Sequence, residues 1–101
     1  MSIKYIKLDK SNNVNKKLVA VFYDENKKKV KTTHFGSAGM SDYTINKDDS
    51  RKELYLKRHR KNENWNDFTS AGSLSRFLLW NEKTLESSLK YYLSKFNLKK
   101  I

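Results

Sequence analysis

Hydrophobic and polar residues alternate along the first third of the chain in the manner of β-strands. Residues 3–8 mix Ile, Tyr and Leu with Lys and predict a first strand, and the apolar run at 18–23 predicts a second that is buried on both faces. Residues 29–35 predict a third strand, paired back on the second as a hairpin. Polar residues 9–15 and 24–27 are expected to form turns, with Asn26 tolerant of a left-handed backbone.

The expected third strand places different residues on its two faces and ends in a glycine-containing segment. Strict alternation groups Lys31, Thr33 and Phe35 on one face, and Val30, Thr32 and His34 on the other. Gly36 and Gly39 then end the hairpin, at positions where the backbone needs the conformational freedom of glycine or a close approach.

The pattern changes to helical spacing in the second half. Ser50 and Glu53 fit a capping box for a first helix that frays near residues 61–62, with Asp48 or Asp49 as the alternative start. A second helix is expected from residue 69 or 70 to about residue 80. A third, capped by Thr84, carries the clearest apolar stripe, at Leu85, Leu89, Tyr92, Leu93 and Phe96.

Strands followed by helices indicate an α+β fold. We expect an N-terminal antiparallel β-hairpin or three-stranded sheet followed by three α-helices. The length of 101 residues predicts a single domain, residues 1–101, with the sheet in residues 1–36 and the helical part in residues 48–97.

Charge is the strongest indication of function. The chain carries 22 Lys+Arg against 11 Asp+Glu, a formal net charge of +11, with the excess heavier in the second half. So much positive charge favours a polyanionic partner. The chain has no cysteine and no long apolar run, and its first ten residues lack the apolar core of a signal peptide. We therefore expect an intracellular location and no membrane partner.

Two basic clusters are the candidate nucleic-acid-binding residues. Residues 51–61 hold six Lys or Arg and a single acidic residue, Glu53, so this helix does not interleave charges for its own stability. Its apolar strip, Leu54 and Tyr55, is expected to face the core. The predicted contacts are Arg51, Lys52, Lys57, Arg58, Arg60 and Lys61 on this helix, with Lys27, Lys28, Lys29 and Lys31 at the hairpin tip. A solvated surface helix and an ordinary solvated turn are the alternatives for these clusters.

Catalytic chemistry has few candidates. Zinc spacing and phosphate-binding glycine loops are absent, and His34 and His59 are the only histidines in the sequence. We expect no enzyme activity, no catalytic residues, no metal and no cofactor. The predicted function is sequence-tolerant nucleic-acid binding, with DNA favoured. The alternatives are a module that binds an acidic protein, and a small metal-dependent nuclease built on His34, Asp42 and Asp48. A homodimer is left open.

Five residues outside the basic clusters also carry expectations. Trp65 is expected to cover the core, since one large ring stands in a polar loop. Arg76 lies inside an apolar helix, where it either reaches solvent along its stem or pairs with a buried acid such as Asp42 or Asp67, and we expect the pair. Lysines at 95, 99 and 100 are expected to complement the negative end of the last helix.

A family resemblance is carried by three sequence blocks. They are residues 32–44 (TTHFGSAGMSDYT), 58–67 (RHRKNENWND) and 69–81 (TSAGSLSRFLLWN). Together the blocks resemble a small family of uncharacterised proteins encoded by large DNA viruses of algae and protists. Asn46 stands where that family usually has a histidine. The resemblance spans about residues 31–96 and carries no site residues. It implies a viral setting, in the virion or the host cytoplasm, and carries no activity over. Together with the charge, this setting leads us to expect that the predicted DNA binding serves viral genome packaging or organisation.

Overall fold

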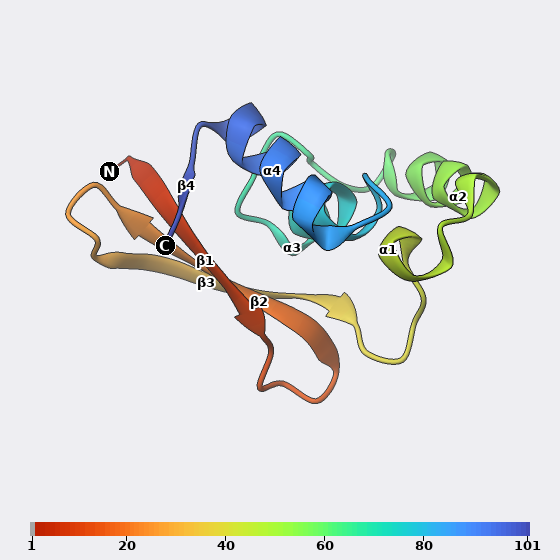
Figure 1. Cartoon of the computed structure of the whole chain (residues 1–101), viewed down its shortest axis with the longest axis horizontal. Coiled ribbons are helices and arrows are strands. Elements are labelled where there is room, and N and C mark those ends of the chain that lie inside the picture. The colour runs from red at the N-terminus through yellow and green to blue at the C-terminus, as the bar shows by residue number, and fades with distance from the viewer. Residues whose placement is uncertain (1) are drawn as a thin grey trace.

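The protein is an α+β structure in which a sheet precedes a layer of helices, as predicted. The computed structural model describes residues 2–101, and Met1 lies outside the described residues. The elements in chain order are β1 (Ile3–Lys10), β2 (Lys16–Asp24), β3 (Lys29–Ser37), α1 (Tyr43–Asn46), α2 (Asp49–His59), α3 (Ala71–Leu74), the π-helical turn η1 (Ser75–Leu79), α4 (Leu85–Phe96) and β4 (Lys99–Lys100). The helices lie on one side of the sheet (Figure 1).

The sheet has the strand order β3-β2-β1-β4. The first three strands form an antiparallel meander, in which side chains alternate between the two faces. Ile6, Ala20, Phe22 and Phe35 point toward the helices and have no exposed surface. The prediction that residues 18–23 are buried on both faces is wrong, because helices cover one face only and residues 19, 21 and 23 stay partly exposed.

The face assignment of β3 is confirmed where the helices cover it. Phe35 is buried, the Thr33 hydroxyl donates to the Thr69 carbonyl at 2.8 Å, and the Lys31 ammonium donates to the Thr69 hydroxyl at 3.0 Å. Gly36 has φ +78°, and a Cβ there would approach the side chain of Leu79 to 2.8 Å. Gly36 therefore serves both roles expected of it, a left-handed backbone and a close approach.

The hairpin turn differs from the prediction in one residue. The Asp24 carboxylate accepts hydrogen bonds from the backbone N–H groups of Asn26 and Lys28, both at 2.9 Å. This Asx-type turn leaves Lys27 with a φ of 62°, so Lys27 and not Asn26 adopts the left-handed conformation.

Strand β4 is a difference from the sequence-based layout. Lys99 and Lys100 pair in parallel with Tyr5 and Ile6 of β1, so they extend the sheet and do not complement the end of a helix. Helix α4 ends instead at Asn97, whose φ of 54° turns the chain back toward the sheet.

The core lies between the sheet and the layer formed by α3, η1 and α4. Leu74, Leu78 and Tyr92 are fully buried there, and the Tyr92 hydroxyl donates to the Phe68 carbonyl at 2.6 Å. Trp65 packs against this core from its loop, as expected, and its indole N–H donates to Glu63 at 3.1 Å.

Arg76 does not pair with a buried acid, so that prediction is wrong. Its guanidinium donates to the Asn81 side-chain oxygen at 3.2 Å and lies 5.3 Å from the ring centre of Trp65. The two predicted partners are engaged elsewhere, Asp42 with Lys17 and Asp67 with Thr69. Burial lowers the pKa of Arg76.

Candidate nucleic-acid interface

Helix α2 projects from one end of the molecule. The Cα trace measures 41 × 28 × 25 Å, and α2 lies at one end of the longest axis, away from the sheet (Figure 1). None of its residues is buried. Most of its circumference is therefore available to a partner.

The start of α2 is fixed by acidic residues. The Asp48 carboxylate accepts from the backbone N–H groups of Ser50 and Arg51, at 3.0 and 3.3 Å, so Asp48 is the N-cap and the capping box on Ser50 is wrong. The next carboxylate, Asp49, accepts from the Tyr43 hydroxyl at 2.5 Å. This hydrogen bond is the main reason that the pKa of Tyr43 is raised to about 12, with desolvation adding to it.

Aromatic stacking and one lysine attach the middle of α2 to the rest of the protein. The Tyr55 ring is stacked between Trp80 and His59, with ring centres 4.5 and 4.2 Å away. Burial in this stack raises the pKa of Tyr55. The Lys52 ammonium donates to the Asn81 carbonyl at 2.6 Å and lies 5.0 Å from the Tyr43 ring centre. Tyr55 thus faces inward as predicted.

Two predictions on this helix need correction. Leu54 does not face the core, because it is 54% exposed. In this turn of the helix, Tyr55 is the residue that packs against the body. Lys52 is not a free cation, since its ammonium is bound to a backbone carbonyl within the protein.

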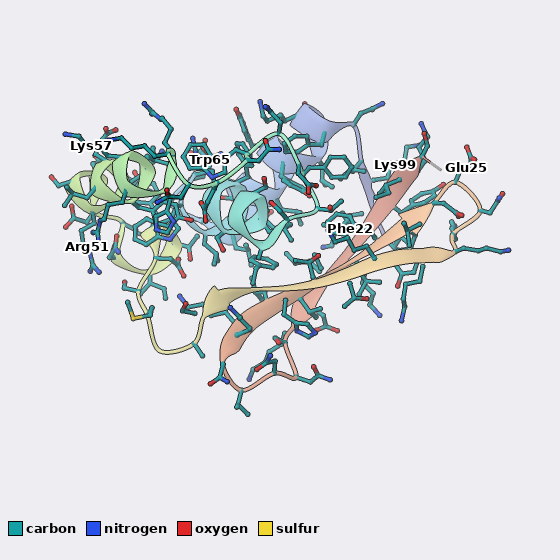
Figure 2. All side chains as sticks on the ribbon, turned by 180° about the vertical axis from the view of Figure 1, so that it is seen from behind. Phe22, Glu25, Arg51, Lys57, Trp65 and Lys99 are labelled. Carbon is teal, nitrogen blue, oxygen red and sulfur yellow. The ribbon has the colours of Figure 1, made fainter. Side chains whose placement is uncertain are left out.

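The remaining basic side chains of α2 and the residues that follow it have no acidic partner. Among residues 2–101 the ion pairs are Lys17–Asp42 and His59–Glu63, and neither uses a Lys or Arg of this region. Glu53 stands four residues before Lys57, yet the two form no ion pair. The exposed and unpaired set is Arg51, Lys57, Arg58, Arg60 and Lys61, and Figure 2 shows Arg51 and Lys57 pointing away from the body.

A cleft of about 430 Å³ lies beside α2. Arg51 and Arg58 line it from the helix, and Lys16 and Lys17 line it from the start of β2. Asp42 neutralises Lys17 through a contact of 2.5 Å and is itself almost fully buried. The cleft therefore brings together three cations without acidic partners: Lys16, Arg51 and Arg58.

Lys16 is a site residue that sequence reasoning missed. It is 35 positions from Arg51, and only the fold brings the two to one cleft. The available signal was the Lys16-Lys17 pair directly before an apolar strand, which places two cations where a strand begins.

The hairpin-tip lysines do not join this interface. Lys27, Lys28 and Lys29 lie at the opposite end of the longest axis from α2 (Figure 1). Lys31 points toward the helical layer, bound to Thr69, and is not free for a partner. Of the ten predicted contact residues, five therefore lie on the α2 surface and three at the hairpin tip. The other two, Lys31 and Lys52, form hydrogen bonds within the protein.

The residues of the alternative nuclease site are not gathered by the fold. Within residues 2–101 no group of three or more His, Asp or Glu side chains is arranged to hold a metal ion. His34 is hydrogen-bonded to the Ser11 hydroxyl at 2.7 Å, while Asp42 holds Lys17 and caps α1.

The described residues include no helix that is both long enough and apolar enough to cross a membrane.

Comparison with known proteins gives one match. A family model described as a family of unknown function (DUF5754) matches residues 6–59, from β1 to the end of α2. The matched segment includes the first of the three sequence blocks and ends at the start of the second. The chain matches no curated protein and no solved structure.

Proposed function

The chain belongs to the DUF5754 family, whose function is unknown, and we propose from its own surface that it is a non-enzymatic, sequence-tolerant nucleic-acid-binding protein. The interface is the exposed basic side of α2, residues 60–61 and the adjoining cleft. DNA is the favoured partner. A role in viral genome packaging stays a prediction.

One observation carries the proposal: six cations at this end of the molecule have no carboxylate within ion-pair distance. They are the five exposed residues of α2 and its C-terminal extension, together with Lys16. Unpaired cations on one surface attract a phosphate backbone and release its counterions. Arg51 and Arg58 stand two helical turns apart, roughly 10 Å along the axis, so they reach separate phosphates.

Sequence tolerance follows from the kind of contact. Lysine and arginine contacts to phosphates position a protein on nucleic acid but do not read bases. The rings of this region, Tyr55, His59 and Trp80, stack on one another where α2 meets the body. They are therefore not available to stack on bases.

Salt dependence tests the proposal. If the six cations neutralise about six phosphates, log affinity for duplex DNA should fall with log salt at a slope near −5. Replacing Arg58, Arg60 and Lys61 with Glu should weaken binding to all sequences alike and reduce the slope by about three, or roughly one per contact. Fluorescence anisotropy at several salt concentrations measures both quantities.

A matched control separates a local interface from net charge. Lys10, Lys83 and Lys90 are exposed and lie outside α2 and its cleft, and replacing all three with Glu changes the net charge by the same amount. The control variant should retain most of the affinity. Equal losses in the two variants would contradict an interface at α2, and no duplex binding by the unmodified protein at low salt would refute the function.

An acidic protein segment is the second candidate for this cleft. Leu54 and Met40 line it and are 54% and 64% exposed, which gives a peptide apolar contacts that a phosphate backbone does not use. A partner recovered by pull-down after nuclease treatment, and lost in a variant with Leu54→Ser and Met40→Ser, would favour this function over the first.

A further inference from the structure

The sheet face that the helices leave open carries a row of two tyrosines between two lysines. Tyr5 and Tyr23 pair across β1 and β2, Lys29 pairs with Tyr23 from β3, and Lys99 pairs with Tyr5 from β4. Paired residues of neighbouring strands point to the same face. The next pair along, Ile6 and Phe22, points to the helices and has no exposed surface, so the row lies on the opposite face.

An irregularity in the pairing of β2 with β3 adds Lys29 to this row, and a second one lies next to Tyr5. The register shifts between Ile3 and Tyr5 in β1 and between Phe22 and Tyr23 in the pairing with β3. The shift in the pairing with β3 lets Lys31 face the helices while Lys29, two positions earlier, stands beside Tyr23 on the open face. Bulges of this kind redirect side chains at sheet edges.

The row is cationic as well as aromatic. Lys29 and Lys99 are exposed, and the Lys27 ammonium lies 5.4 Å from the centre of the Tyr5 ring. Lys7 adds a charge in the next row, beside Val21. None of these four lysines has a carboxylate within ion-pair distance among the described residues. The acid on this face of β1, Asp9, is four residues away from Tyr5.

A recess of about 340 Å³ adjoins the row. It is lined by Lys4, Tyr5, Glu25, Asn97 and Lys99. Figure 2 shows Lys99 and Glu25 near one another, at the far end of the molecule from Arg51 and Lys57. The recess and the row thus form a surface separate from the α2 interface.

We infer that this surface, the tyrosine row, binds single-stranded nucleic acid by stacking unpaired bases on Tyr5 and Tyr23 while the flanking lysines contact phosphates. Partly exposed aromatic rings on a sheet accept bases of any sequence, because every base has a flat face. A duplex keeps its bases stacked inside the helix and cannot offer them to the rings. The charge of the surface favours a nucleic acid over an apolar or basic protein partner.

The inference goes beyond the proposed function, because it assigns a second site and a preference for unpaired strands. It also accounts for the hairpin-tip lysines, which lie too far from α2 to share its partner contacts.

Anisotropy with a fluorescein-labelled oligo-dT of about 20 nucleotides, longer than typical single-strand sites, and with a duplex of the same length tests it. Replacing Tyr5 and Tyr23 with Val should lower affinity for oligo-dT by about tenfold per ring while changing duplex affinity little. Tyr91→Val is the matched control, since Tyr91 is an exposed tyrosine on α4 outside this face, and it should change neither affinity.

Unchanged oligo-dT affinity in a folded double variant would overturn the inference, as would equal losses for the two probes. If the double variant does not fold, judged by circular dichroism, Lys29→Gln with Lys99→Gln replaces it. This pair should weaken oligo-dT binding more than duplex binding, and an equal effect on both would overturn the inference. The α2 triple variant keeps the two proposals apart, because failure of the α2 interface would leave duplex binding unchanged in that variant whatever the tyrosine variants show.

Discussion

Helices α2 and α4 have nearly the same length, 11 and 12 residues, but opposite relations to the core. Helix α4 buries Ser88 and Tyr92 and packs Leu85, Leu89, Leu93 and Phe96 against the core cluster. Helix α2 has no fully buried residue and touches the body through a ring stack, a lysine and a carboxylate. Packing of an apolar face is what usually stabilises a helix in a protein.

The difference indicates two separate uses of a helix in one small protein. Helix α4 closes the hydrophobic core, so changes to it should affect the whole fold. Helix α2 is held at few points, which leaves its arginines and lysines on the surface, so changes to it should have local effects on stability and larger effects on binding.

Removing Tyr92 should have the largest effect. Tyr92→Ala deletes a fully buried ring, its edge contact with Phe96 at 5.0 Å and the hydrogen bond to the Phe68 carbonyl. We expect a loss of about 3–5 kcal/mol in the free energy of unfolding, measured with urea. Tyr91→Ala, on the exposed side of α4, is the control and should cost far less. Equal costs would mean that α4 does not close the core.

Removing the ring stack should loosen α2 alone. Tyr55→Leu loses two stacking contacts, each about 0.5–1.5 kcal/mol, so local opening of α2 should become easier by about 1–3 kcal/mol. Amide hydrogen exchange should speed up in residues 49–59 and stay unchanged in residues 85–96. Faster exchange in both helices would show that α2 unfolds cooperatively with the core and does not differ from α4 in this respect.

The cap of α2 should contribute less. Asp48→Ala leaves two N–H groups of the first turn without their acceptor and should cost about 1 kcal/mol in unfolding free energy. Ser50→Ala is the matched control, because Ser50 is inside the helix and a Ser-to-Ala change there is close to neutral. A larger effect at Ser50 than at Asp48 would restore the capping box that the sequence predicted.

The smallest effect concerns acid pH and the segment that connects the two helices. Hydrogen bonds from the Thr69 hydroxyl and backbone N–H hold the pKa of Asp67 below its ordinary value of 3.8. A lowered carboxyl pKa in the folded state adds stability above the ordinary pKa, and this stability is lost as pH falls through the folded-state pKa. Urea midpoints between about pH 5 and pH 2.5 should fall less in Asp67→Asn, which keeps an acceptor but cannot ionise. An identical decline in both proteins would remove Asp67 as a cause.

Local sequence patterns were enough to predict the three antiparallel strands, helix α4 and the cationic helix α2. Alternation identified the three antiparallel strands, and helical spacing identified α4 with its Thr84 cap. The basic run 51–61 identified α2 as the cationic helix. Each of these depends on side-chain periodicity or on a cap within one segment, so a single sequence contains the information.

Features created by tertiary contacts were not predictable in the same way. Strand β4 has two residues and exists because β1 offers a free edge, where the Ile101 N–H also donates to the Ile6 carbonyl at 2.9 Å. Lys16 and Arg58 line the same cleft because of how α2 docks on the body, and this docking is held by the Tyr55–Trp80 stack. The exposure of Leu54 also follows from this docking. The spacing of apolar residues in the sequence does not reveal which side of the helix the Tyr55–Trp80 stack will turn toward the body.

The pairing of the last strand with the first also has a consequence for synthesis. Residues 3–37 can form their meander as they leave the ribosome, because those strands are neighbours in sequence. The outer edge of β1 stays open until residues 99–101 have emerged, and the apolar side of the sheet stays uncovered until α4 has emerged. A nascent chain whose first three strands have emerged while α4 and β4 have not therefore exposes an apolar sheet face and an open strand edge, so stalling at that stage should promote aggregation more than the released, folded chain does.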